Sequence, residues 1–383
     1  MATSSYLRRL NQRKVLHSIL RHRTASRTQL AELADMSQAT VGRIVDDLIA
    51  QEVIAEVNEA APMAQPSASG GTPQLGRPSK PLELDRTRRR FLLIQLGVRQ
   101  TRLAAVPVAI PNDEQWPVQF DTPASAEAWR AQLKKGCRQL PLTDLEAVII
   151  SSPGVVDEPN GKVLLSPNMR WAETSSFSEL IESVTDAPVK VVQEIRALAL
   201  GQLAAEPTLE DFLLVDFGDG LGAASVIGSA LQTGHLPLSG ELGHTPVLGN
   251  DRACGCGAVG CVETLVSRSG LTQTSREHGG PETWDDLINE INKRGLPKWM
   301  KQALDATANT VAGALNVEGI ANALFTGTIT EFPESVTDYL CEQVRRGTMW
   351  SRLGTVVCKR APRRRMAGMI CVGIDRVLFG PEV

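Results

Sequence analysis

The chain has 383 residues, of which 22% are charged and 42% are hydrophobic, with 43 acidic residues against 40 basic ones. This length allows two or three domains, and the composition is that of a globular protein, which excludes wholesale disorder. The net charge of -3 excludes a uniformly basic nucleic-acid coat but leaves room for a local basic patch. Because no run of about 18 apolar residues occurs, no transmembrane helix is expected.

The cysteines and the N-terminal segment indicate the compartment. Three of the seven cysteines fall within residues 254–261 and the other four are scattered, which is unlike a disulfide framework. The first 23 residues contain no apolar core of the kind that signal peptides carry. We therefore expect a cytoplasmic protein with no membrane partner and one metal site.

The basic excess is concentrated at the N-terminus. Residues 1–50 contain eight Lys and Arg against four Asp and Glu, a local charge of +4. Apolar spacing predicts helices over 7–20, 27–34 and 38–51, with Ser26 and Ser37 capping the second and third. Two helices joined by a short turn are typical of a helix-turn-helix unit, whose second helix enters the major groove of DNA.

The third predicted helix carries the candidate base-reading side chains. Because its apolar residues face inward, its outer face near the N-terminus presents Gln38, Ala39, Thr40 and Arg43. A glutamine suits adenine, an arginine suits guanine and a methyl group suits thymine. The candidate phosphate contacts are Gln12, Lys14 and Arg27.

Two short segments after these helices complete the predicted DNA-binding domain. Residues 53–57 and 81–85 are predicted to pair as a hairpin wing, with the Pro/Ala/Ser/Gly-rich segment 59–80 as a flexible wing tip or linker. Residues 1–85 are thus predicted to form a winged helix-turn-helix domain that binds double-stranded operator DNA. By the motif alone, the alternative is a small helical dimerisation module with a solvated basic face.

From Leu82 onward, short apolar runs alternate with helical stretches. We expect strands over 91–97, 101–110, 147–151, 189–192, 212–218 and 222–228. Helices are expected over 126–137, 176–184 and 195–205. This alternation predicts an α/β domain of about 300 residues, large enough to divide into two lobes.

One glycine-rich stretch carries the residue types of a metal site. His244, Cys254, Cys256 and Cys261 follow one another with the spacing H-x9-C-x-C-x4-C. Thiolates and an imidazole in a tetrahedral set suit Zn²⁺, and four protein ligands leave no open position for catalysis, so the zinc is expected to be structural. The alternative is a set of reduced cysteines in a glycine-rich loop without metal.

The same stretch identifies a family. The patterns E-x-G-H over 241–244 and C-x-C-G-x-x-G-C-x-E over 254–263, with SSPGVVD at 151–157, SPNMRW at 166–171 and the glycine-rich stretch 218–244, resemble the signature of the ROK family of repressors, open reading frames and sugar kinases. The resemblance covers most of 82–383, and the preceding helix-turn-helix is that of the repressor branch. It implies an actin-like, ribonuclease H-like body over 86–383. Lobe one would take about 86–197 plus the C-terminal end, and lobe two about 198–367, with the zinc loop at 244–261.

The residues that correspond to the kinase machinery of this family have changed. Where the kinases have D-x-G-G-T, this chain has Gln95 in place of the carboxylate and Val98 in place of the second glycine. The loop 218–222 keeps its glycines but adds Asp219, and a tight turn between two strands is an equal interpretation. The Asn-Asp pair of the catalytic base corresponds to Gln193-Glu194, one methylene longer. Because phosphoryl transfer depends on positioning, we expect that the protein is not an enzyme.

The residues that correspond to the family's sugar contacts are better preserved than those that correspond to its phosphate-binding loops. The family's sugar contacts imply Asn168, Glu194, Glu241, His244 and Glu263 as effector-binding residues here. Glu194 stands at the position of the kinase base, and Glu241 and Glu263 have the alternative role of supporting the zinc loop. The basic run 359–365 is interpreted as a solvated loop.

The sequence thus predicts a transcriptional regulator of carbohydrate metabolism, most simply a repressor. It would bind a palindromic operator as a homodimer or homotetramer and respond to a sugar or amino-sugar effector. Two alternatives remain open: a sugar kinase with a DNA-binding appendage, and a constitutive DNA-binding protein whose effector pocket has decayed.

Overall fold

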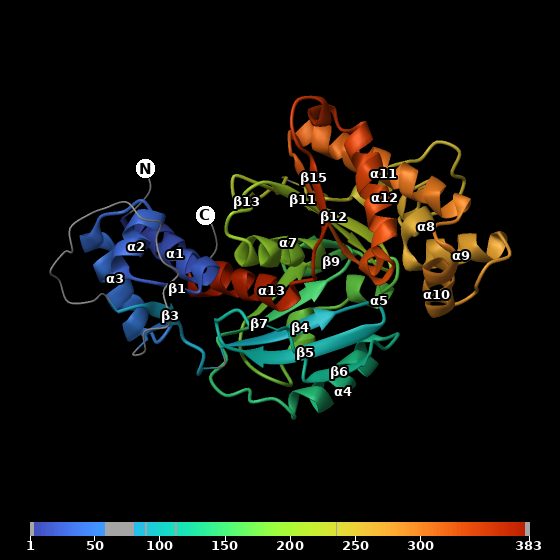
Figure 1. The fold of residues 1–383 in the computed structure, drawn as a ribbon. Coiled ribbons are helices and arrows are strands. Elements are labelled where there is room, and N and C mark those ends of the chain that lie inside the picture. The colour runs from blue at the N-terminus through green and yellow to red at the C-terminus, as the bar shows by residue number, and fades with distance from the viewer. Residues whose placement is uncertain (1–3, 58–79, 89, 112, 235, 380–383) are drawn as a thin grey trace.

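The computed structural model describes residues 4–57, 80–88, 90–111, 113–234 and 236–379, and the predicted wing tip, apart from Lys80, lies outside them. The chain forms an N-terminal headpiece and a body of two lobes, as Figure 1 shows. Among the described helices, none combines the length and apolar character needed to cross a membrane.

The headpiece has the three helices and the wing that the sequence predicts. It contains α1 (Ser4–His22), α2 (Arg27–Leu33), α3 (Gln38–Ala50) and a sheet in the order β1 (Thr24–Ala25), β3 (Leu82–Leu84), β2 (Ile54–Glu56). Ser26 caps α2 in a capping box and the Ser37 side chain accepts from the Thr40 backbone at the start of α3, so both predicted caps are confirmed. β2 and β3 pair antiparallel, with Ala55 opposite Glu83, as expected for the wing.

Lobe one is built on a five-stranded mixed sheet. The strand order is β10 (Val189–Gln193), β7 (Ala147–Ser152), β4 (Phe91–Leu96), β5 (Gln100–Val106), β6 (Val118–Asp121). β10, β7 and β4 run parallel, whereas β5 and β6 are antiparallel hairpin partners. α4 (Ala126–Cys137), α5 (Arg170–Glu173), α6 (Phe177–Ile181) and the hairpin β8 (Val155–Asp157) with β9 (Lys162–Leu165) complete the lobe. The predicted helix over 126–137 matches α4, whose apolar face buries Trp129 and Leu133.

Lobe two repeats the same arrangement. Its sheet has the order β15 (Val357–Arg360), β14 (Asn322–Gly327), β11 (Phe212–Phe217), β12 (Leu221–Ile227), β13 (Ala230–Leu231). Again three strands are parallel and two follow as antiparallel partners. Helices cover this sheet: α8 (Glu263–Val266), α9 (Arg268–Glu277), α10 (Trp284–Arg294), α11 (Lys298–Glu318) and α12 (Glu334–Gly347). The one-turn helices η1 (Leu242–His244), η2 (Thr328–Glu331) and η3 (Met349–Arg352) join its elements.

Two helices lie side by side between the sheets. These are α7 (Glu194–Ala205) and α13 (Arg365–Gly373), the latter continued by the π-helical turn η4 (Ile374–Leu378), as Figure 1 shows in green and red. One continuous apolar core runs from α1 and α3 of the headpiece through β4 of lobe one to Met369 and Ile370 of α13. The headpiece is therefore packed against the body rather than tethered to it.

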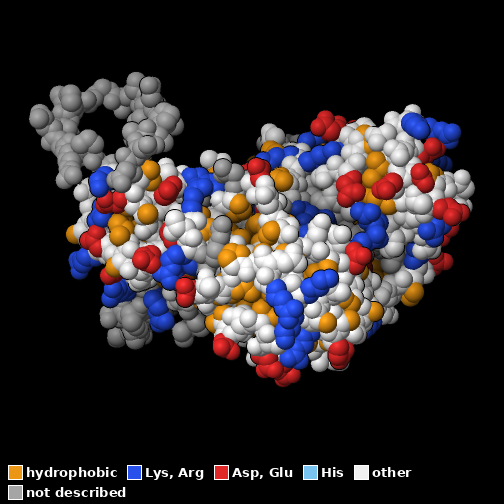
Figure 2. All heavy atoms as spheres, turned by 90° about the horizontal axis from the view of Figure 1, so that it is seen from below, with side chains coloured by type: hydrophobic (Ala, Val, Ile, Leu, Met, Phe, Trp, Pro, Cys, Tyr) orange, Lys and Arg blue, Asp and Glu red, His pale blue; other side chains and the backbone are white. Residues whose placement is uncertain are grey.

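Basic and acidic side chains are interspersed over the face in Figure 2, where the headpiece forms a separate knob beside the body. At its junction with the body, Arg23 Nη1 donates to Ile110 O at 2.8 Å, and Arg90 Nη2 donates to Gln51 O at 2.7 Å. These contacts fix the base of the headpiece on lobe one.

Candidate effector cleft, metal group and DNA-reading helix

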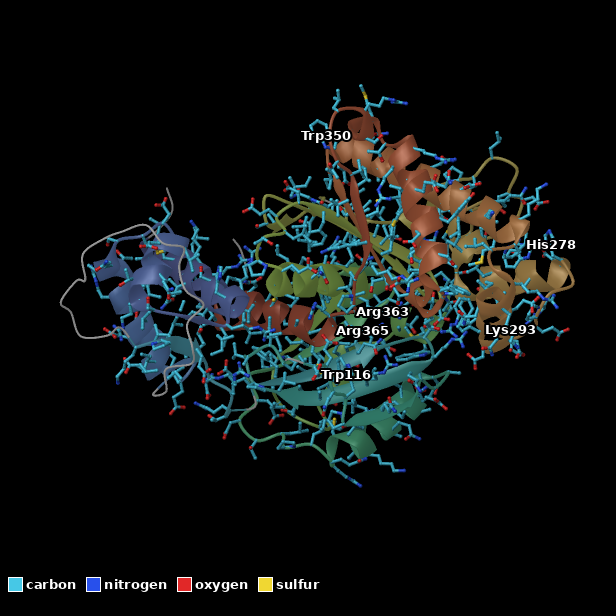
Figure 3. All side chains as sticks on the ribbon, viewed as in Figure 1. Trp116, His278, Lys293, Trp350, Arg363 and Arg365 are labelled. Carbon is cyan, nitrogen blue, oxygen red and sulfur yellow. The ribbon has the colours of Figure 1, made fainter. Side chains whose placement is uncertain are left out.

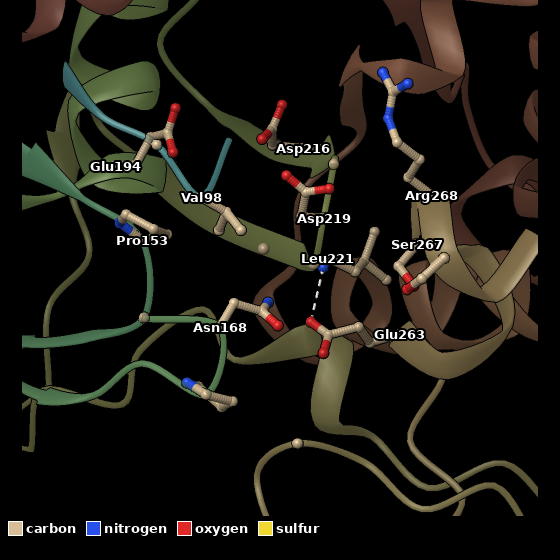
Figure 4. Close-up of a pocket in the computed structure, with 18 of the residues that line it drawn as sticks. Val98, Pro153, Asn168, Glu194, Asp216, Asp219, Leu221, Glu263, Ser267 and Arg268 are labelled. Atoms are coloured by element: carbon tan, nitrogen blue, oxygen red, sulfur yellow. Dashed lines mark hydrogen bonds between the residues drawn. The ribbon is translucent and has the colours of Figure 1, made fainter. Parts of the chain in front are cut away.

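A cleft of about 790 Å³ opens where the two lobes face each other. It is lined by residues at the carboxyl ends of β4, β7 and β10 in lobe one and of β11 in lobe two, where ligands of open α/β sheets bind. Five lining residues are those that the family resemblance assigns to the sugar: Asn168, Glu194, Glu241, His244 and Glu263. Figure 4 shows Asn168, Glu194 and Glu263 around this space. The fold thus brings the whole predicted effector set to one cavity.

The metal group lies at the wall of the cleft. One ligand atom from each of His244, Cys254, Cys256 and Cys261 lies within 4.8 Å of the others. Cys256 Sγ lies 3.8 Å from Cys261 Sγ, and Cys254 Sγ lies 3.6 Å from His244 Nδ1. Sulfur atoms about 3.8 Å apart are what tetrahedral Zn–S bonds of about 2.3 Å require. The four residues thus form a group that can hold a metal ion, with Nδ1 as the histidine ligand.

The glycines of this loop permit close contacts. Gly257 and Gly260 have positive φ angles of 98° and 86°. Gly255 packs on the Pro167-Asn168 turn of lobe one so closely that an added Cβ would lie 2.8 Å from the proline ring. The metal loop therefore lies directly against the turn that carries Asn168.

Two carboxylates connect the metal group to the cleft. The second ring nitrogen of His244, Nε2, lies 3.5 Å from Glu241 Oε2, and Glu241 Oε1 accepts from Gln193 Nε2 at 2.9 Å. Glu263 Oε2 accepts from the Leu221 backbone at 2.9 Å, the bond drawn in Figure 4, and its Oε1 lies 3.8 Å from Cys254 Sγ. Burial raises the pKa of Glu241, although the Gln193 hydrogen bond and His244 oppose this. Both carboxylates thus reach the metal group as well as the cavity.

Glu194, the first residue of α7, is engaged inside the protein. Its Oε1 accepts from Arg365 Nε at 2.7 Å and from Gln95 Nε2 at 3.4 Å. Burial alone would raise the pKa of Glu194, but the guanidinium groups of Arg365 and Arg363 outweigh it and lower that pKa. The carboxylate is therefore held as an anion by an internal cation.

The two turns that correspond to phosphate loops are also occupied by ion pairs. Asp219, in the turn between β11 and β12, pairs with Arg99 of the β4–β5 turn at 2.9 Å across the cleft. The Gly218 backbone donates to Gly220 O at 2.8 Å, so the loop is the tight turn between strands that the sequence allowed. Gln95 is buried and accepts from Arg102 at 2.9 Å.

The basic run 359–365 is not a solvated loop, and that interpretation was wrong. Figure 3 places Arg363 and Arg365 between the lobes at the end of α13. Arg363 lies against Gly218 and Gly327, where an added Cβ would come within 3.1 and 2.4 Å of its Nη2. The charge run alone does not show this, because β11 and α7, which carry the carboxylates that pair with these arginines, are distant in the sequence. One feature of the sequence pointed to it. Gln95 stands where the family's kinases have a carboxylate, which indicates that the charges in this cleft differ from those of a kinase.

The candidate DNA-reading residues lie at the start of α3. Gln38, Ala39 and Arg43 are exposed and Thr40 is half-buried, with its Oγ1 2.9 Å from Ser37 Oγ. Val41, Ile44, Val45 and Leu48 form the buried face of the same helix. The helix thus presents the predicted outer face to solvent.

The predicted phosphate contacts differ in their surroundings. Gln12 is only 8% exposed, so its assignment as a phosphate contact was wrong: it lies on the inner side of α1. Arg27 is partly exposed and pairs with Asp46 of α3 at 2.8 Å. A second guanidinium nitrogen, Nη2, lies 3.7 Å from Glu56 Oε1 of β2, so Arg27 joins α2 to both α3 and the wing.

Comparison with known proteins agrees with this architecture. The model of the ROK family matches residues 115–370, more than half of the chain. The chain is 26% identical over 409 aligned positions to a putative xylose repressor of Caldicellulosiruptor sp. strain Rt8B.4, with 100% of both chains covered. It is also 26% identical to the transcriptional dual regulator NagC of Escherichia coli K12, with 70% of this chain and 64% of that protein covered.

Solved structures show the same fold. A ROK family transcriptional regulator, described as a homolog of the E. coli MLC protein, superposes with a TM-score of 0.72 at 18% identity and covers 96% of each chain. A ROK glucokinase from Streptomyces griseus, in complex with glucose and AMPPNP, superposes with a TM-score of 0.58 at 21% identity, covering 73% of this chain and 97% of its own. The predicted actin-like body with two lobes is thus confirmed. With the family model spanning both lobes and the metal loop, this chain belongs to the ROK family.

Proposed function

We propose that this protein is a sugar-responsive transcriptional repressor that binds operator DNA through α3. The observation that carries the proposal is the combination of an exposed base-reading face on α3 with a body whose cleft keeps the sugar-facing residues and fills its phosphate turns with arginines. Relatives named as xylose repressors, which cover the whole chain, support the same function. A role on the chromosome also favours the cytoplasm as its location.

Operator binding is tested with the promoter DNA of the protein's own gene. Arg43→Ala removes an exposed guanidinium of the recognition helix, and loss of one base contact costs about 1–3 kcal/mol of binding free energy. Arg294→Ala removes another exposed arginine, from α10 of lobe two, and serves as the charge-matched control. We expect fluorescence anisotropy to show weaker binding for the first variant alone. Equal binding by both variants would contradict the assignment of α3.

A palindromic operator needs a two-fold protein, and we propose a homodimer or a dimer of dimers. Light scattering on the purified chain measures its mass directly. A monomer at micromolar concentration, both alone and on DNA, would contradict this assembly.

The effector in this proposal is a neutral sugar or an amino sugar. Glu241, Glu263 and Asn168 offer acceptors and an amide donor around one cavity, the pattern that vicinal hydroxyl groups need. Xylose and N-acetylglucosamine are the first probes, because relatives are named for them. A ligand of the folded state raises the melting temperature with its concentration, and Glu241→Gln should abolish that rise. If none of a panel of sugars stabilises the protein, it is a DNA-binding protein without an effector.

We also propose that the body does not transfer phosphate. Arg363 lies against the two glycine turns, and Gln95 replaces a carboxylate that would hold Mg²⁺. The ROK kinases that share this fold make sugar phosphorylation the rival function. A coupled ATPase assay with a panel of hexoses tests this alternative. Turnover above the background rate would show that the protein phosphorylates sugars.

The metal in the four-residue group is proposed to be zinc. Three thiols and an imidazole are the donor set that suits Zn²⁺, and all four positions are filled by the protein. Bound zinc would hold the loop 244–261 in shape. His244, Glu241 and Glu263 would then be fixed as one unit facing the sugar.

A further inference from the structure

α13 and its continuation η4 reach from the cleft to the headpiece. Arg365 is the first residue of α13, and Asp375 lies in η4, ten residues later, roughly 15 Å along a helix axis. Figure 1 shows these two helices, which we call the rod, in red. One end of the rod contacts α1, and the other lies between the lobes. Together, α13 and η4 have polar contacts with both the cleft carboxylate Glu194 and α1.

At the cleft, the rod is fixed by two carboxylates. Arg365 pairs with Glu194 at 2.7 Å, and both side chains are mostly buried, with 14% and 16% exposed. Glu114 Oε1 accepts from the Met366 backbone at 2.7 Å, which anchors the first turn of the helix to lobe one. Glu194 is at the same time one of the residues proposed to face the effector.

At the headpiece, the rod is fixed by one carboxylate of η4 and two side chains of α1. Asp375 Oδ1 lies 2.7 Å from Arg13 Nε and 2.6 Å from His17 Nε2. The Asp375 side chain is only 13% exposed. Around it, Val15 and Ile19 of α1 belong to the same apolar core as Ile370 of α13. Movement of η4 therefore acts directly on α1.

Between these ends the rod is rigid because it packs backbone to backbone on α7. A Cβ on Gly368 would lie 1.6 Å from Ala197 O, and one on Gly201 would lie 2.0 Å from Arg364 O. Such a crossing leaves no space for the helices to slide independently. α7 itself begins at Glu194, so both helices start at the same ion pair.

We propose that α13 and η4 are the element that couples the cleft to the headpiece, with the Arg365–Glu194 pair as its input and the Asp375 contacts with α1 as its output. A ligand hydroxyl that bonds to Glu194 competes with Arg365 and shifts the first turn of α13. Because the rod is rigid, the shift arrives at Asp375 and changes how α1 is held. The effector role of this coupling rests on the proposed function, but the coupling itself is a property of the free protein.

The test therefore uses hydrogen exchange on the full chain without DNA or sugar. Arg365→Gln breaks the input pair and should raise exchange of the α1 amides 13–22 on the order of fivefold, with α11 unchanged as the internal reference. Arg99→Gln breaks a different ion pair of the same cleft, on the β4–β5 turn, and is the matched control. It should leave α1 as it is, and Arg365→Lys, which keeps the charge, should restore most of the protection.

Asp375→Asn supplies the second half of the experiment. Alone it should raise exchange in α1, and Arg365→Gln should then add little, because the output contact is already lost. Equal effects of Arg365→Gln and Arg99→Gln on α1, no effect of either, or full additivity with Asp375→Asn would each overturn the coupling. Failure of the protein to bind operator DNA would instead contradict the proposed function and leave these exchange results intact.

Discussion

Arg363 and Asp216 form a two-point ion pair in the cleft: Nε lies 2.7 Å from Oδ1, and Nη2 lies 3.0 Å from Oδ2. Nη2 also donates to Phe217 O at 2.7 Å, at the end of β11. Burial opposes the charge of Arg363, yet Asp216 outweighs burial and raises the pKa of the guanidinium above its ordinary value. A cation of the protein thus lies directly beside the glycine turns of the cleft, paired to an internal carboxylate.

Replacing this arginine should destabilise the protein. Arg363→Met leaves Asp216 buried without its cation, and we expect a loss of about 2–3 kcal/mol in the free energy of unfolding, less than for a fully buried pair. We expect a smaller loss than for a fully buried pair because the Arg363 side chain is 23% exposed. Chemical denaturation measures the loss, and Arg294→Met, in an exposed pair of α10, should change stability by less than about 0.5 kcal/mol. The double variant Arg363→Met/Asp216→Asn should recover most of the loss; if it is as unstable as the single variant, the ion pair is not the cause.

Removal of the metal should destabilise the loop 244–261, which forms one wall of the cleft. Elemental analysis of the purified protein should find about one zinc per chain, and Cys261→Ser should abolish it because a tetrahedral site needs its fourth ligand. Dialysis against a chelator should lower the melting temperature and weaken any sugar-induced stabilisation. Cys137, buried in lobe one with burial raising its thiol pKa to about 12, lies outside the group. Cys137→Ala should retain the metal, and a zinc-free wild-type protein would refute the site.

The contact of α1 with η4 should depend on acid pH. Burial alone would raise the pKa of Asp375, but His17 and Arg13 outweigh it and hold that pKa below its ordinary value. A carboxyl with a lowered pKa in the folded state stabilises the protein above its unfolded pKa of about 3.9, and this contribution is lost as pH falls through the folded pKa. The difference in unfolding free energy between wild type and Asp375→Asn should therefore shrink as the pH falls below about 4. If this difference instead grows below about pH 4, the pKa of Asp375 is not lowered in the folded protein.

The crossing of α7 and α13 should not tolerate a side chain. In Gly368→Ala the new Cβ would meet Ala197 O at 1.6 Å, and we expect a loss of about 2–3 kcal/mol because backbone must move. Gly313 of α11 is an exposed helical glycine with nothing within 4 Å, so Gly313→Ala should stabilise the protein by up to about 1 kcal/mol. Comparing the thermal unfolding of the Gly368→Ala and Gly313→Ala variants separates the steric effect from helix propensity. If both substitutions stabilise, the helices are not in backbone contact.

Local patterns in the sequence predicted the elements well. The caps Ser26 and Ser37, the wing strands and the apolar strands of both sheets follow from short-range spacing, and α4 matches its predicted bounds. The metal group and the gathering of Asn168, Glu241 and Glu263 at one cavity followed the family motifs. The contacts of Arg363 and Arg365 could not be predicted, since their partners Asp216 and Glu194 lie more than 140 residues away. Gln12 was misplaced because periodicity alone does not determine which polar residue of a helix turns inward.

The repeated strand order of the two sheets has a consequence for how the lobes move. Each half ends in a parallel edge strand followed by one helix: β10 leads into α7, and β15 leads into α13. The two halves thus share one topology, and their closing helices meet at Gly201 and Gly368. Because backbone meets backbone there, we expect any opening and closing of the lobes to turn about that contact. Since the headpiece contacts the far end of this helix pair through Asp375, we expect a small rotation between the halves to displace the headpiece.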